Sequence, residues 1–250
     1  MFPILFQYKF ITIGGYGVML GIGIYLAYLL FERELTLRKM DPEIAYKILL
    51  VAIPAGIIGS KVFHIMDHWE EFAADPMGMI FSGTGLSIYG GLVFAFLFSY
   101  IIIRKSGEKP LAILDAVAPS IAVGYGFGRI GCHVAGDGCY GIATGTILGT
   151  AYPNGIVPIS QAVYPTPLFE SFFSLLVAGI LLNLRQKPVK RGTIFFLYLV
   201  LNGLPRLLVE FIRRNPEIFL GLTQAQLVAI FIAAAGATGL FIIHKKQATA

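Results

Sequence analysis

Apolar runs separated by short polar stretches fill almost the whole chain. Seven of these runs approach the roughly 20 apolar residues that an α-helix needs to cross the hydrocarbon core of a bilayer. We therefore predict an all-α, polytopic membrane helix bundle with about seven transmembrane helices, in which residues 1–250 form a single membrane-embedded domain. The predicted spans cover residues 13–31, 44–66, 87–103, 112–128, 167–184, 192–212 and 223–243.

Composition supports this prediction and excludes several other classes of protein. Hydrophobic residues make up 56% of the 250 residues, and charged residues only 13%. That is about half the charged share of a typical soluble domain. So little charge cannot coat a soluble globule of this size, which excludes a disordered chain, a coiled coil and an ordinary cytosolic enzyme.

The distribution of basic residues predicts the orientation of the chain. Most of the 19 lysines and arginines lie after the first, third and fifth predicted spans and in the C-terminal tail. Short cytoplasmic loops carry such an excess, so we expect the N-terminus outside and the C-terminus, with Lys245 and Lys246, in the cytoplasm. The net charge of +5 is then a signal of topology, and we expect no nucleic-acid partner.

One long segment, at about 129–166, is predicted to lie on the outer face. It is rich in glycine and proline and nearly free of charge. Loops of this length usually have a function or fold over a functional site.

Ionisable residues inside apolar spans are costly, so they usually face the bundle interior and pair. Two have simple structural readings: Asp115 favours a helix end, and Lys61 extends to the outer surface. Glu170 caps its helix or pairs locally. The ionisable candidates are Lys61, Asp115, Arg129, Glu170, Arg206 and Glu210.

Arg206 and Glu210 stand four residues apart on one helical face and can pair. They either fix helix packing or hold Arg206 ready for an anion. Arg129 follows Gly124, Gly126 and Gly128, which allow close helix approach and leave space for a headgroup. Because a planar guanidinium binds phosphate through two donors, we predict a lipid-headgroup site near the outer interface.

Two cysteines and a histidine near Arg129 could be metal ligands. Cys132, His133 and Cys139 offer three ligands with no obvious fourth, so we expect no metal and no cofactor. A Cys132–Cys139 disulfide is an alternative on an outer face, but two unpaired thiols are the commonest outcome. His64 and His68 are better explained as part of an interfacial belt than as a ligand pair.

Several motifs together resemble those of the prolipoprotein diacylglyceryl transferase family. GRIGCHVAGDGCYG at 128–141 resembles the family signature, and GLPRLLVEFIR at 203–213 resembles its R-x-x-x-E-x-x-R motif. The order and spacing of further motifs agree over most of the chain. These are YGVMLGIGIYLAY from Tyr16, SIYGGL at 87–92, PTPLFES at 165–171 and GLTQAQ at 221–226.

The resemblance implies a seven-span enzyme of the bacterial inner (plasma) membrane. It would transfer the diacylglyceryl group of phosphatidylglycerol to the lipobox cysteine of a prolipoprotein, releasing glycerol 1-phosphate. It implies Arg129, Arg206 and Tyr89 as catalytic residues. The substrate-binding residues that it implies are Tyr16, Gly90, Gly91, Cys132, Asp137, Gly141 and Glu210.

Three positions depart from the family pattern. Tyr89 replaces a histidine, Cys132 an asparagine and Asp137 a glutamate. A neutral tyrosine is a poor base near pH 7, so another group accepts the thiol proton or the protein has diverged. The alternative is an anionic-lipid-binding membrane protein that is non-catalytic or uses another acceptor, or a transporter. The inverted repeats typical of many transporters are not visible in the sequence.

Overall fold

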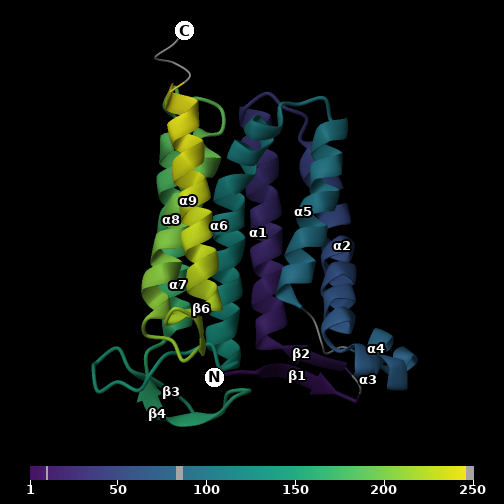
Figure 1. Cartoon of the computed structure of the whole chain (residues 1–250), viewed down its shortest axis with the longest axis vertical. Helices are drawn as coiled ribbons and strands as arrows, with labels where there is room; N and C mark the ends of the chain where they lie inside the picture. Colours follow the sequence, from purple (N-terminus) through teal and green to yellow (C-terminus); the bar gives the residue numbers. More distant parts are fainter. Residues whose placement is uncertain (10, 83–86, 246–250) are drawn as a thin grey trace. The chain divides into compact units, whose positions relative to one another are not determined.

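Long helices occupy the predicted spans in the computed structural model, which describes residues 1–9, 11–82 and 87–245 (Figure 1). Lys246 lies outside the described residues. The long helices are α1 (Gly15–Leu37), α2 (Glu43–Asp67), α5 (Ile88–Lys105), α6 (Pro110–Ala135), α7 (Thr166–Leu184), α8 (Thr193–Glu210) and α9 (Gln224–Lys245).

Six of these helices, all but α5, are long and apolar enough to cross a membrane, judged over the described residues. This confirms a polytopic helical membrane protein. The 18-residue α5 coincides with the third predicted span, and its crossing of the bilayer stays a prediction. The orientation of the chain also stays a prediction.

Short elements connect the long helices and were not predicted. Two short helices, α3 (Trp69–Ala74) and α4 (Pro76–Phe81), follow α2. Three antiparallel hairpins pair strands of two to five residues, too short to leave a clear alternating pattern in the sequence. The strands are β1 (Ile4–Tyr8) with β2 (Ile11–Gly14), β3 (Thr150–Tyr152) with β4 (Ile159–Val163), and β5 (Glu217–Phe219) with β6 (Leu222–Thr223).

The chain divides into two compact units. Unit 1 comprises Met1–Phe31 and Leu114–Ala250, and unit 2 comprises Glu32–Ile113. Within unit 1, α6, α7 and α8 share an apolar core, and α8 lies against α9 (Figure 1). The buried core residues are Ala118, Ala122, Val177, Ala178, Leu181, Ile194 and Tyr198.

Unit 2 is built around the close pairing of α2 and α5. A Cβ atom added at Gly90 would lie 2.3 Å from the carbonyl oxygen of Gly59, and one added at Gly59 would lie 2.4 Å from that of Gly90. Small residues let membrane helices approach until their backbones touch. Glycine at both positions is therefore what this crossing requires.

Helix α6 is longer than its sequence predicts. The fourth span was expected to end near residue 128, but the helix continues to Ala135. Glycines weaken helices in water, whereas inside a bilayer each backbone group must bond within its own segment, so a glycine-rich stretch stays helical. Arg129, Cys132 and His133 consequently lie on the helix and not in the loop that follows it.

Two of the ionisable residues organise local structure. The Asp115 carboxylate accepts hydrogen bonds from the backbone N–H groups of Gly192 (2.6 Å) and Phe195 (2.8 Å) at the start of α8. It thus satisfies N–H groups that have no partner within that helix, although it was expected to act on its own helix end. In unit 2, the Lys61 amine donates to the carbonyl oxygens of Met79 and Ser82, both at 3.0 Å.

Candidate active site

Glu170, in the second turn of α7, is the centre of a buried ionic cluster. Its side chain is only 2% exposed. One carboxylate oxygen lies 2.6 Å from Arg129 Nε. The other lies 3.2 Å from Arg206 Nη1 and 3.0 Å from Arg213 Nη1. Arginines from α6, from α8 and from the turn after α8 therefore converge on one carboxylate.

Glu210 is the second acid of this cluster. Its Oε2 atom lies 2.6 Å from Arg206 Nη1, which confirms the pairing predicted from the four-residue spacing. Its other oxygen accepts hydrogen bonds from the Asn215 amide and, at 2.9 Å, from the Thr223 hydroxyl. We call Arg129, Glu170, Arg206, Glu210 and Arg213 the arginine–glutamate cluster.

The arginine–glutamate cluster holds three guanidinium groups and two carboxylates, so one positive charge is in excess. The arginine side chains are between 9% and 20% exposed. Tyr125 donates a hydrogen bond to Glu170 and accepts one of 3.0 Å from Arg129 Nε. In such low-dielectric surroundings, an uncompensated charge attracts an anion far more strongly than it does in water.

Backbone contacts fix the position of Arg213. An isolated antiparallel bridge joins Gly141 to Arg213, and Ile142 N donates to Ile212 O at 2.9 Å. A Cβ atom at residue 141 would lie 2.4 Å from Ile212 O. Gly141 thus allows the loop after α6 to touch the turn that carries Arg213.

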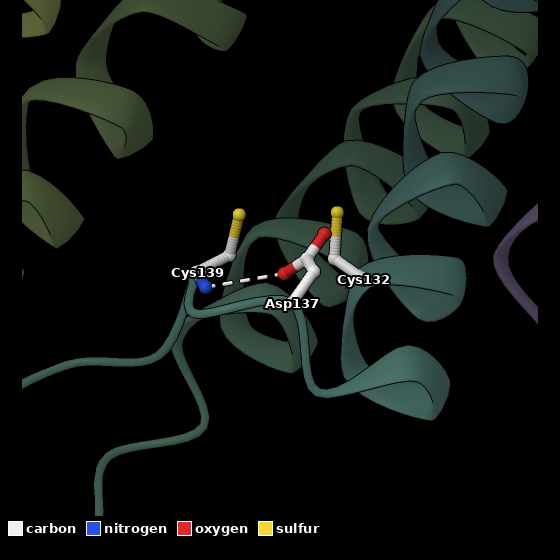
Figure 2. A group of neighbouring side chains, drawn as sticks. All are labelled: Cys132, Asp137 and Cys139. Carbon is white, nitrogen blue, oxygen red and sulfur yellow. Dashed lines mark hydrogen bonds between the residues drawn. The ribbon is translucent and has the colours of Figure 1, made fainter. Parts of the chain in front are cut away.

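A second polar group lies next to Arg129. The sulfur atoms of Cys132 and Cys139 and a carboxylate oxygen of Asp137 all lie within 4.8 Å of one another. Figure 2 shows the Asp137 carboxylate between the two cysteines. Arg129 Nη1 lies 4.0 Å from Cys132 Sγ and 3.8 Å from Cys139 Sγ. We call Cys132, Asp137 and Cys139 the thiol–carboxylate cluster.

Both cysteines are free thiols and no disulfide joins them, as we predicted from the commonest outcome for two cysteines. A hydrogen bond with the Cys132 thiol lowers the pKa of the Cys139 thiol to about 7, although burial opposes this shift. The nearby positive charge of Arg213 acts in the same direction.

The histidine that follows Cys132 does not join the two thiols. His133 Nδ1 is 2.9 Å from the Tyr152 hydroxyl, so His133 is not in the group of close ligand atoms. The third potential metal ligand beside the two cysteines is therefore Asp137, and not His133 as the sequence suggested. In unit 2, the rings of His64 and His68 lie with their centroids 4.3 Å apart and their planes tilted by 36°.

The remaining predicted site residues fall in both units. In unit 1, Tyr16 of α1 lies beside α6, where a Cβ atom at Gly131 would be 3.2 Å from the Tyr16 ring. Tyr89, Gly90 and Gly91 belong to α5 in unit 2. A Cβ atom at Gly91 would lie 2.4 Å from Ser60 Oγ, so Gly91, like Gly90, serves the contact with α2. Tyr89 is 41% exposed, and its catalytic role stays a prediction.

Several residues of the cluster were missing from the predicted site. Glu170 was recognised as a costly charge but read as a local cap or partner, and Arg213 was present only as the last residue of its motif. The contacts of Tyr125, Asn215 and Thr223 left no signal in the sequence, because common polar residues become informative only once their neighbours are known.

Comparison with known proteins gives a consistent identification. The family model described as prolipoprotein diacylglyceryl transferase matches residues 3–242. A phosphatidylglycerol–prolipoprotein diacylglyceryl transferase of Clostridium tetani is 33% identical over 233 residues, which cover 92% of this chain and 93% of that protein. A protein of the same name from Dehalococcoides mccartyi is 33% identical over 98% of this chain and 94% of its own length. The chain therefore belongs to the prolipoprotein diacylglyceryl transferase family, whose members are enzymes.

Proposed function

We propose that this protein transfers the diacylglyceryl group of phosphatidylglycerol to the thiol of a lipobox cysteine in a prolipoprotein, in the bacterial inner membrane. The observation that carries the site assignment is the convergence of Arg129 and Arg206, from two different membrane helices, on Glu170. The names of the relatives support the two substrates.

The reaction exchanges a carbon–oxygen bond for a carbon–sulfur bond. The substrate thiol loses its proton, and its sulfur attacks the phosphate-bearing carbon of the diacylglyceryl group. The bond from that carbon to the phosphate oxygen breaks, and glycerol 1-phosphate leaves as the lipidated protein forms. Negative charge therefore grows on the leaving phosphate in the transition state.

In this proposal Arg129 and Arg206 offset that charge. Guanidinium groups bind phosphate oxygens through paired, charge-assisted hydrogen bonds. Donors already held in position need not reorganise during the reaction, and such preorganised electrostatics usually supply the largest share of catalysis. Glu170 and Glu210 keep the two guanidinium groups in position without cancelling the excess positive charge.

The same positive charge assists the nucleophile. A cysteine thiol with a pKa near 8.5 is mostly protonated at neutral pH, and nearby positive charge favours its thiolate. In this proposal Tyr89 acts as a hydrogen-bond donor or relays the proton. Tyr16, Cys132, Asp137 and Gly141 shape the substrate site, whereas the contacts of Gly90 and Gly91 with α2 assign these glycines to packing.

The test is transfer by the purified chain in vesicles of phosphatidylglycerol, with a lipobox peptide as acceptor. Mass spectrometry detects the thioether-linked diacylglycerol. We expect Arg129→Ala and Arg206→Ala each to lose at least about 100-fold in rate, the scale of losing one transition-state donor. Arg191→Ala, which removes an exposed charge, serves as the matched control.

Two results would contradict the proposal. Near-normal transfer by both folded variants would exclude the phosphate-binding role of the arginines. Binding of phosphatidylglycerol by the unaltered chain without any thioether product would instead indicate the alternative that Tyr89 and Cys132 raise: a lipid-binding member of the family that performs no transfer or uses another acceptor.

A further inference from the structure

The thiol–carboxylate cluster has the composition of a metal site. Two sulfur atoms and one carboxylate oxygen lie within 4.8 Å of one another, and the three side chains project to one side of the loop after α6 (Figure 2). Two sulfurs bound to one tetrahedral zinc ion at about 2.3 Å are roughly 3.8 Å apart. The ligand atoms therefore need to move by no more than about 1 Å to share a cation.

The loop after α6 carries Asp137 and Cys139 and is shaped to bring them beside Cys132 at the end of the helix. Gly136 and Gly138 have φ angles of +62° and +89°, a region that favours glycine, and they flank Asp137 on both sides. A Cβ atom at Gly136 would lie 2.7 Å from the Cα atom of Gly155. The chain therefore turns back sharply after Cys132, which brings Asp137 and Cys139 beside it.

Charge balance favours a divalent cation. Two thiolates and one carboxylate would bring three negative charges to a bound ion. Arg129, whose Nη1 atom lies 3.8 to 4.0 Å from both sulfurs, is a nearby positive charge, but it also pairs with Glu170. A divalent ion would offset two of the three negative charges. N–H groups directed at coordinating sulfurs are the kind of outer contact that orients and stabilises metal ligands.

We propose that Cys132, Asp137 and Cys139 bind a divalent thiophilic cation of the zinc class. Thiolates favour such ions over magnesium or calcium, which prefer oxygen ligands alone. Three protein ligands leave the fourth tetrahedral position for water or an anionic oxygen. The bound ion would fix the loop after α6 against the helix end and hold Arg129 in position.

Metal binding by the purified, reduced full-length chain in detergent tests the proposal. The chain is loaded with zinc and desalted, and its zinc content is measured by mass spectrometry. We expect about one zinc per chain. Cys132→Ser and Cys139→Ser should lower zinc affinity by at least the roughly 10- to 100-fold that losing an outer-shell contact costs. The double variant His64→Ala/His68→Ala is the control, because these neighbouring imidazole rings are another candidate for zinc binding.

A second measurement does not depend on how well the serine variants fold. Cadmium added to the unaltered chain should give an ultraviolet thiolate-to-metal absorption with two thiols per ion. Zinc should also raise the unfolding temperature of the unaltered chain but not that of Asp137→Asn, since binding to the folded state stabilises it.

Four results would overturn the proposal: no zinc above background, no cadmium–thiolate absorption, zinc retained by both serine variants, or zinc lost only in the histidine control. None of these readouts measures diacylglyceryl transfer. Failure of the metal site would therefore leave the proposed function unaffected, and failure of transfer would leave the metal site unaffected.

Discussion

The arginine–glutamate cluster of unit 1 and the α2–α5 pair of unit 2 hold their helices together in opposite ways. In the first, Arg129 and Arg206 reach from different helices to one carboxylate, so charged side chains define the contact. In the second, Gly59 and Gly90 meet through their backbones, so the absence of side chains defines it.

This difference separates two kinds of motif residue that look alike in the sequence. A glycine at a helix crossing is required by packing, and the contacts of Gly90 already account for it. A buried charge costs desolvation energy that helix packing alone does not require, since apolar residues can replace a buried ion pair without loss of stability. The charged cluster is therefore the better guide to function, and each prediction below tests that distinction.

The largest expected effect follows from Glu170→Gln. Removing this charge leaves Glu210, which pairs with Arg206 and Arg213, as the one carboxylate of the arginine–glutamate cluster. Loss of one partner from a buried ion pair costs about 3–5 kcal/mol. We expect that loss in the free energy of unfolding, measured by denaturation in detergent, together with loss of transfer. Glu70→Gln, at an exposed position, should change neither, and a Glu170→Gln variant of unaltered stability would show that the cluster is not an ionic unit.

A side chain added at Gly90 should destabilise the crossing of α2 and α5 by overpacking. Gly90→Ala places a methyl group 2.3 Å from the Gly59 carbonyl oxygen and 2.5 Å from Phe63 Cβ. Overpacking of this kind costs about 1–3 kcal/mol, measurable as a lower midpoint of unfolding. The matched control is Gly179→Ala on α7, where an added Cβ atom meets nothing within 4 Å. Equal stability of the two variants would mean that α2 and α5 do not approach as described.

Gly141→Ala tests the glycine whose backbone contact positions Arg213. The added methyl group would lie 2.4 Å from Ile212 O and would displace the turn before Arg213. We expect a destabilisation of about 1–2 kcal/mol, smaller than at Gly90 because a loop yields more readily than a helix crossing. The transfer rate per folded molecule should also fall, because Arg213 moves with the displaced turn. A variant with a normal transfer rate and reduced stability would show that the position of Arg213 does not matter for transfer.

The sequence predicts the long helices well because each coincides with its own apolar run. Pairing of Arg206 with Glu210 was also predictable, because helical spacing places both on one face. The meeting of Arg129, Glu170 and Arg213 was not, since it depends on how α6, α7 and the turn after α8 pack. The end of α6 was misjudged because glycine was read by its behaviour in water.

The smallest effect concerns a charge that serves structure alone. Asp115 accepts two backbone N–H groups at the start of α8, so Asp115→Ala should cost about 0.5–2 kcal/mol, the range for losing a helix cap. Asp115→Asn keeps an acceptor oxygen and should recover most of that loss. Both variants should retain transfer per folded molecule, because the interaction lies at the far end of α8 from Glu210. A loss of transfer without a loss of stability would show that this buried charge, too, belongs to the chemistry.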